Sequence, residues 1–134
     1  MDISTALEFV RANPRGIIIT RKRSGDPQTS LIVAGVDDAG RVVVSARVRS
    51  WKVRHLRRDP RVTLTMFTDR FFGEWIQIDG TAEVLSLPEA MEPLVDYYRS
   101  MRGEHPDWDE YRAAMTAEQR VLIRIAVEHA GPDR

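Results

Sequence analysis

The sequence predicts an α+β, mainly β domain whose antiparallel strands form a small closed or split barrel with peripheral helices. Six short segments, rich in β-branched or alternating apolar residues, indicate strands, and turn-forming residues separate most of them. Strands and helices do not alternate in the βαβ order of a parallel sheet, and no internal repeat occurs. The 134 residues therefore form one domain, 1–134, that buries roughly two thirds of its unfolded surface.

The first half of the chain predicts one helix followed by three strands. Ile3, Leu7 and Val10 recur at helical spacing, and Pro14 ends that helix. Turn sequences separate the β-branched segments that follow, so three successive strands are expected to pair as an antiparallel meander. The expected elements are a helix over 3–12 and strands over 16–20, 28–36 and 41–46.

The second half predicts three helices among three further strands. Ser50 is placed to cap a short helix that Pro60 ends. Ser86 and Glu89 have the spacing of a capping box, which predicts a longer helix. The expected elements are a short helix between 50 and 59, strands over 62–67, 74–85 and 121–128, helices over 86–101 and 107–115, and a frayed tail over 131–134.

Several functional classes are excluded by what the sequence lacks. Without cysteine there is no disulfide or thiol chemistry, and the three histidines lack metal-ligand spacing, so we expect no metal site. The GxSxG, P-loop and GxGxxG motifs are absent. Apolar runs are too short to span a membrane, and no signal-peptide pattern occurs, which makes the cytoplasm the expected location. An enzyme with this sequence depends on a cofactor for its chemistry.

The most distinctive stretch is 41–61, where eight basic residues accompany one acid although the whole chain has no net charge. The segment 69–110 has the opposite bias, with eleven acids and three bases. Such segregation indicates a local anion site or complementary subunit faces. Arginine and lysine suit phosphate oxygens, and Ser45 adds a hydroxyl close in sequence to Arg47 and Lys52. A solvated helix face stays open as an alternative, whereas nucleic-acid binding conflicts with zero net charge.

Three aromatic residues near the acidic segment each have two interpretations. Trp75 is either a half-buried strand residue in the core or a subunit interface, or a ring near a planar cofactor. Phe71 and Phe72 form either a lid over a site or contacts between subunits. The sequence leaves both choices open.

Four segments together resemble one known family. Residues 16–20 with 26–28 are similar to the family's first hairpin, and residues 52–61 to its basic signature. Residues 80–83 are similar to its fifth-strand motif. Residues 97–99 with 103–115 form the longest and most specific of the four segments. This pattern resembles the flavin and deazaflavin oxidoreductases of the pyridoxamine-phosphate-oxidase-like superfamily, specifically the actinobacterial branch that uses coenzyme F420. The similarity runs nearly the full length. The chain departs from it at His55, where the family usually has asparagine.

The resemblance implies a six-stranded split β-barrel homodimer with the cofactor in a groove at the subunit interface. Lys52 and its neighbours would bind the phosphate, the second strand would run beside the deazaflavin ring, and Trp75 and Gln77 would contact the cofactor from the partner subunit. The implied cofactor-binding residues are Gln28, Thr29, Ser30, Leu31, Ile32, Ser45, Arg47, Ser50, Lys52, Arg54, Trp75 and Gln77. Arg57, Arg58 and Arg61 would serve the cofactor tail, the interface or solvent.

The activity implied by the resemblance is coenzyme F420-dependent reduction, in which a hydride passes from the reduced deazaflavin to an unsaturated or quinone-like small molecule. Such transfer needs only positioning of donor and acceptor, which agrees with the missing catalytic triad. Two alternatives stay open. One is an FMN-binding oxidase or reductase of the same fold, since FMN also carries a phosphate; the other is a non-catalytic cofactor-binding protein. No nucleic-acid or membrane partner is expected.

Overall fold

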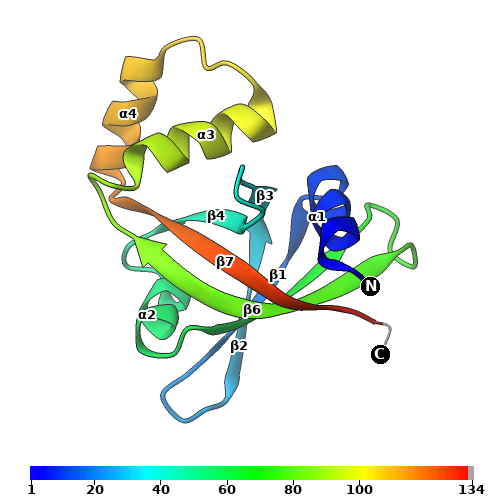
Figure 1. Cartoon of the computed structure of the whole chain (residues 1–134). Helices are drawn as coiled ribbons and strands as arrows, with labels where there is room; N and C mark the ends of the chain where they lie inside the picture. The colour runs from blue at the N-terminus through cyan, green and yellow to red at the C-terminus, as the bar shows by residue number, and fades with distance from the viewer. Residues whose placement is uncertain (133–134) are drawn as a thin grey trace.

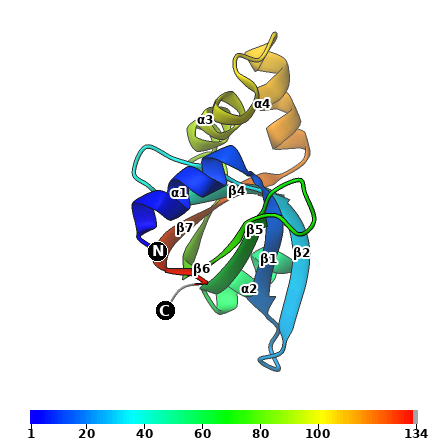
Figure 2. The ribbon, with the colours of Figure 1, turned by 90° about the vertical axis from the view of Figure 1, so that its right-hand side faces the viewer.

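The computed structural model describes residues 1–132 and shows one antiparallel sheet curled into a half-barrel (Figure 1). Seven strands lie in this part of the chain, in the order β2-β1-β5-β6-β7-β4-β3. They are β1 (Arg15–Arg21), β2 (Pro27–Val33), β3 (Gly35–Val36), β4 (Val42–Arg47), β5 (Arg61–Phe67), β6 (Trp75–Leu85) and β7 (Arg120–Gly131). Residues 1–132 also contain the helices α1 (Ile3–Ala12), α2 (Trp51–Arg58), α3 (Met91–Arg102) and α4 (Trp108–Ala117). Figure 2 shows α3 and α4 beyond one end of the half-barrel.

The antiparallel α+β architecture is confirmed, but the structure has seven strands where the sequence predicts six. The predicted strand over 28–36 is two strands, β2 and β3, with Ala34 between them; the N–H of Ala34 continues the pairing with the β1 side by donating to the carbonyl of Pro14 at 2.7 Å. β2 pairs with β1 at one edge of the sheet, whereas β3 pairs with β4 at the opposite edge. Both antiparallel pairings of the predicted meander therefore occur, but its middle strand is divided between the two edges of the sheet.

The last strand is longer than predicted. β7 extends from Arg120 to Gly131, and its pairing with β6 continues as far as Gly131, opposite Gln77. The expectation of a frayed tail is thus wrong for Gly131, and residues 133–134 of that tail lie outside the described part of the chain.

Two predicted helix caps are also wrong. Ser50 occupies the N-cap position of α2, but its hydroxyl donates to the carbonyl of Arg47 at 2.9 Å and caps no helix N–H. The capping box that begins at Ser86 does not form, because residues 87–90 are turns and α3 begins only at Met91. The expected helix start is confirmed at Ser50, whereas at Ser86 it is wrong, because α3 has Ala90 in its N-cap position.

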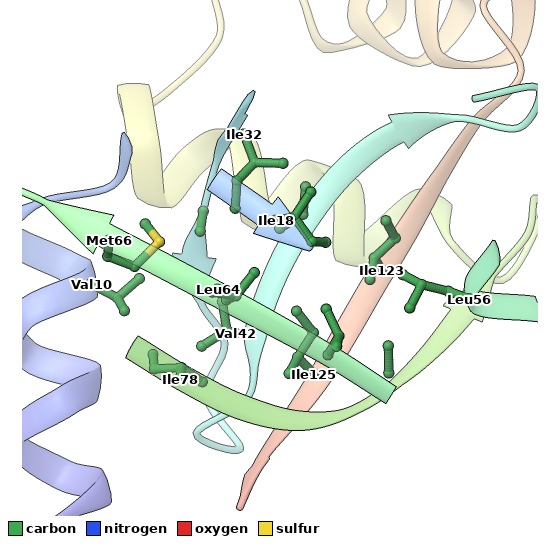
Figure 3. Close-up of a cluster of buried hydrophobic side chains, with 14 of the residues drawn as sticks. Val10, Ile18, Ile32, Val42, Leu56, Leu64, Met66, Ile78, Ile123 and Ile125 are labelled. Carbon is green, nitrogen blue, oxygen red and sulfur yellow. The ribbon is translucent and has the colours of Figure 1, made fainter. Parts of the chain in front are cut away.

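The inside of the half-barrel is a single apolar core. Figure 3 shows labelled side chains of the strands gathered there, such as Ile18 and Leu64, with Val10 from α1 and Leu56 from α2 at the ends of the cluster. Leu64 and Ile125 are fully buried. Burying such a side chain stabilises the fold by roughly 1.5–3 kcal/mol, so the alternating residues of the strands account for most of the driving force.

A second cluster lies on the outer face of β4 and β7 and holds the α3–α4 hairpin. Val43 and Leu122 point to this face and pack with Leu94, Tyr111 and Met115. Because β4 and β7 are buried on both faces, the hairpin is fixed beside the end of β4, where the basic stretch begins. No helix within residues 1–132 has the length and apolar character needed to cross a membrane.

Candidate anion-binding groove

An open groove of about 700 Å³ lies between the sheet and the α3–α4 hairpin, and we refer to it as the basic groove. β2, the end of β4, the start of α2 and the start of β7 form one wall, and α3 and α4 form the other. Its lining contains four cations, Arg47, Lys52, Arg102 and Arg120, and one carboxylate, Glu118. The groove therefore carries excess positive charge, as an anion-binding site requires.

Strand pairing and helix position bring three of these cations together. Arg47 ends β4 and is the direct pairing partner of Arg120, which begins β7. Lys52 lies in the first turn of α2 and, among residues 1–132, forms no ion pair with a carboxylate. Burial, followed by the nearby charge of Arg120, lowers the pKa of the Lys52 amine. The charged form of Lys52 therefore lacks a nearby negative charge to stabilise it, and a bound anion would supply that charge.

The beginning of α2 adds a further attraction for anions. The first N–H groups of any helix lack partners inside the helix, and the helix dipole places partial positive charge there. In α2 the Ser50 side chain does not cap these groups, and both Ser50 and Lys52 line the basic groove. Helix N–H groups, a serine hydroxyl and a lysine are a donor set suited to phosphate.

The opposite wall of the groove is aromatic and apolar. Apart from the charged residues Arg102 and Glu118, it consists of Tyr97, Tyr98, Met101, Tyr111 and Met115. The Tyr97 hydroxyl donates to the carbonyl of Val33 at 2.7 Å, and the Tyr111 hydroxyl donates to the carbonyl of Leu94 at 2.9 Å. Burial raises the pKa of Tyr97, and burial with the neighbouring Tyr97 raises the pKa of Tyr111 to about 12. Both rings stay neutral at physiological pH, so this wall offers flat, uncharged surface.

The structure places ten of the twelve predicted site residues in three separate hollows. Leu31, Ile32, Ser45, Arg47, Ser50 and Lys52 line the basic groove. Gln28 and Arg54 line a separate hollow of about 590 Å³ beside α2, and Thr29 and Ser30 lie along β2 between these two places. Trp75 and Gln77 line a third hollow, of about 180 Å³, on the exposed face of β6. Within one chain, the basic groove thus collects half of the predicted set, and the role of each residue stays a prediction.

Sequence reasoning missed Arg120, Glu118 and the aromatic wall. Arg120 lies far along the chain from Arg47, and only the register of β4 with β7 reveals that they are neighbours. Tyr97 and Tyr111 fall inside the segments that carried the family resemblance, but no periodicity distinguished them from core residues. Their position in the groove depends on how the α3–α4 hairpin packs, which local sequence does not specify.

Three arginines of the basic stretch make hydrogen bonds or ion pairs outside the basic groove. Arg57 donates to the Ser86 hydroxyl at 2.7 Å, and Arg58 donates to the carbonyl of Arg21 at 2.5 Å. Arg61 pairs with Asp59 at 2.7 Å. Arg57, Arg58 and Arg61 therefore do not line the basic groove, although they belong to the basic stretch.

His55 is a buried residue of α2 that links this helix to the sheet. Its side chain is 4% exposed, and its Nδ1 lies 2.9 Å from the Thr20 hydroxyl. Burial, followed by the charges of Arg58 and Lys22, lowers the pKa of the imidazole from its ordinary value of 6.5. His55 is therefore neutral in the folded protein at pH 7 and helps to hold the helix that carries Lys52.

A pH dependence of stability follows from His55. Below pH 6.5 the unfolded chain binds a proton at this residue that the folded chain does not, so the free energy of unfolding falls with decreasing pH. The slope due to one such group is at most about 1.4 kcal/mol per pH unit. We expect His55→Asn to lose less stability than the wild type between pH 7.5 and 5.5, measured by urea denaturation. Parallel losses in both proteins would contradict the assignment.

Comparison with known proteins agrees with the observed fold. A conserved hypothetical protein from Mycobacterium tuberculosis is 25% identical, with a TM-score of 0.78 over 97% of this chain and 82% of that one. A FAD-binding protein from Mesorhizobium loti is 23% identical, with a TM-score of 0.69 over 97% and 92% of the two chains. A structure described as an F420 reductase is 16% identical, with a TM-score of 0.69 over 92% and 94%.

A family model points to the same group of proteins. The model described as pyridoxamine 5'-phosphate oxidase matches residues 4–131, which include every strand of the half-barrel and every residue of the basic groove. Because this match spans nearly the whole sequence, the chain belongs to the pyridoxamine 5'-phosphate oxidase family.

Proposed function

We propose that this protein is a coenzyme F420-dependent oxidoreductase that reduces an unsaturated or quinone-like small molecule. The observation that carries the proposal is the basic groove. Arg47, Lys52 and Arg120 converge there with the open N-terminus of α2, opposite a wall of neutral tyrosines. The basic wall of the groove therefore suits a phosphate, and the tyrosine wall suits a flat ring system.

The donor set fits the phosphate of such a cofactor. Arginine offers forked N–H donors, lysine offers a compact charge, and helix N–H groups complete the shell of oxygen contacts. A hydrogen bond to a charged group contributes roughly 1.5–3 kcal/mol, so two or three of them contribute about 3–9 kcal/mol before ordering costs. Micromolar binding needs about 8 kcal/mol net, so the contacts of the ring system must add to those of the phosphate. FMN presents a similar phosphate, and for that reason it is the alternative ligand.

The residues of this chain would bind and orient the cofactor and its acceptor, because the groove, as residues 1–132 form it, contains no nucleophile–base pair. When bound, a reduced deazaflavin supplies a hydride to an acceptor held against it. Arg47 and Lys52 would fix the position of the phosphate, and Tyr97 and Tyr98 would exclude water from the ring. Positioning of this kind is the main contribution of a protein to cofactor chemistry.

The proposal includes a homodimer, because the predicted contacts Trp75 and Gln77 lie in a different hollow from Lys52 in one chain. A site that joins them needs a second copy. Large exposed apolar side chains support such an interface: Leu31 is 80% exposed, Phe71 88% and Phe72 89%. The rings of Phe71 and Phe72 lie 4.7 Å apart, and contiguous exposed apolar surface is typical of association surfaces.

The test is a fluorescence titration of the purified protein with coenzyme F420 and with FMN. Sedimentation at the same protein concentration gives the oligomeric state. We expect micromolar or tighter binding of coenzyme F420, weaker binding of FMN, and a dimer. Isolation of a yellow protein with tightly bound FMN would overturn the choice of cofactor. Binding of coenzyme F420 without turnover of any quinone, enone or tetrapyrrole would favour a cofactor-binding protein instead.

A further inference from the structure

One carboxylate, Glu118, is placed among the cations of the basic groove. Its Oε1 accepts hydrogen bonds from Nε of Arg120 at 2.9 Å, and it lies 3.6 Å from Nη2 of Arg47. Glu118 is the C-cap residue of α4 and lines the groove together with both arginines. The single acid therefore pairs with two of the groove's cations.

The backbone holds this arrangement in an uncommon conformation. Gln119, between Glu118 and Arg120, has φ of 53°, in the left-handed region that residues other than glycine seldom adopt. The turn lets side chains two positions apart, Glu118 and Arg120, face each other in the same groove. The Gln119 carbonyl also accepts the N–H of Val48 at 2.9 Å, which ties the turn to the end of β4. Such local conformations concentrate at functional sites.

Glu118 offsets a repulsion that the sheet itself creates. Arg47 and Arg120 are directly opposed on paired strands, where like charges destabilise the pairing. The carboxylate between them relieves this repulsion in the chain without a ligand. An anionic ligand in the groove would approach the same arginine donors, so ligand and carboxylate compete for them.

We propose that Glu118 is an internal counter-ion of the basic groove, which competes with the ligand's phosphate for Arg47 and Arg120 and so limits its affinity. That the ligand carries a phosphate rests on the proposed function. It predicts that removing the charge of Glu118 strengthens phosphate binding. An anchoring role, in which Glu118 orients the arginines toward the ligand, predicts the opposite sign.

The variant that tests this is Glu118→Gln, because glutamine keeps the size and a carbonyl acceptor but loses the charge. We expect it to bind coenzyme F420 about fivefold more tightly, which corresponds to about 1 kcal/mol. The apo variant should melt at a lower temperature than the wild type, since Arg47 and Arg120 then repel each other. The unphosphorylated deazaflavin, which lacks the phosphate and the tail, should bind both proteins equally. Glu110→Gln removes the same charge from an exposed position of α4 and is the matched control.

Inorganic pyrophosphate separates this inference from the proposed function. We expect pyrophosphate to raise the melting temperature of Glu118→Gln more than that of the wild type, with no such gain once Arg47 and Arg120 are both alanine. That result, without binding of coenzyme F420 by either protein, would sink the proposed cofactor and leave the counter-ion role standing. Unchanged or weaker binding of both pyrophosphate and coenzyme by Glu118→Gln overturns the counter-ion role.

Discussion

Lys52→Ala is expected to weaken the binding of coenzyme F420 by at least about tenfold, measured by fluorescence titration. Lys52 is the one groove cation of α2, and it has no carboxylate partner among residues 1–132 that would share its charge. Loss of one charge-assisted hydrogen bond removes roughly 1.5–3 kcal/mol, and each 1.4 kcal/mol is tenfold in affinity. Burial already disfavours its charged form, so the ammonium gains more from an anion than a solvated lysine does.

Two matched variants show whether the position of this charge matters. Arg57→Ala removes one positive charge from the same helix, but Arg57 points to the Ser86 hydroxyl and does not line the basic groove. We expect its affinity to stay within about twofold of the wild type, since exposed charges at a distance are largely screened by salt. Lys52→Arg keeps the charge and should retain most of the affinity. Equal weakening by Lys52→Ala and Arg57→Ala would mean that only the general charge of α2 attracts the ligand.

The basic stretch illustrates how far local sequence predicts the site. Its charge bias and the short helix within it are visible from composition and proline placement, and Lys52, Arg47 and Ser45 do line one groove. The same pattern did not separate them from Arg57 and Arg58, because all are basic residues near one helix. What separates them is the direction of each side chain, which follows from the packing of Val53, His55 and Leu56 into the core.

In the fold, too, local sequence predicts the positions of the strands, whereas their order and register depend on residues far apart in the chain. Alternation of apolar residues located most strands to within one or two residues, since period-two burial is a local property of a half-buried strand. The break between β2 and β3 was not predicted, because β3 lies at the other edge of the sheet through its pairing with β4, and the local pattern of residues does not reveal that pairing. The neighbourhood of Arg47 and Arg120 likewise depends on strand register, and register is set by the whole core.

Gly80→Ala is expected to be the most destabilising of the small substitutions considered, with a loss of about 3 kcal/mol or more in the free energy of unfolding. Gly80 lies where the pairing of β6 with β7 shifts register. A Cβ added there would lie 2.3 Å from the carbonyl oxygen of Ala126 and 3.0 Å from Cγ2 of Ile125. The oxygen belongs to the backbone, so β7 must move away from β6 to admit the methyl group. Such a loss is a large part of the 5–15 kcal/mol that typically stabilises a domain.

Gly35→Ala is the control, because it adds the same methyl group to another strand glycine. There the nearest atoms, Ser100 Oγ and Val43 Cγ2, are both 3.5 Å from the added Cβ, an ordinary contact distance. We expect Gly35→Ala to change the free energy of unfolding by less than about 1 kcal/mol, since it also restricts the unfolded chain. Urea denaturation of both variants measures the difference. A Gly80→Ala protein that unfolds at the wild-type urea midpoint would show that β7 yields easily where it pairs with Gly80.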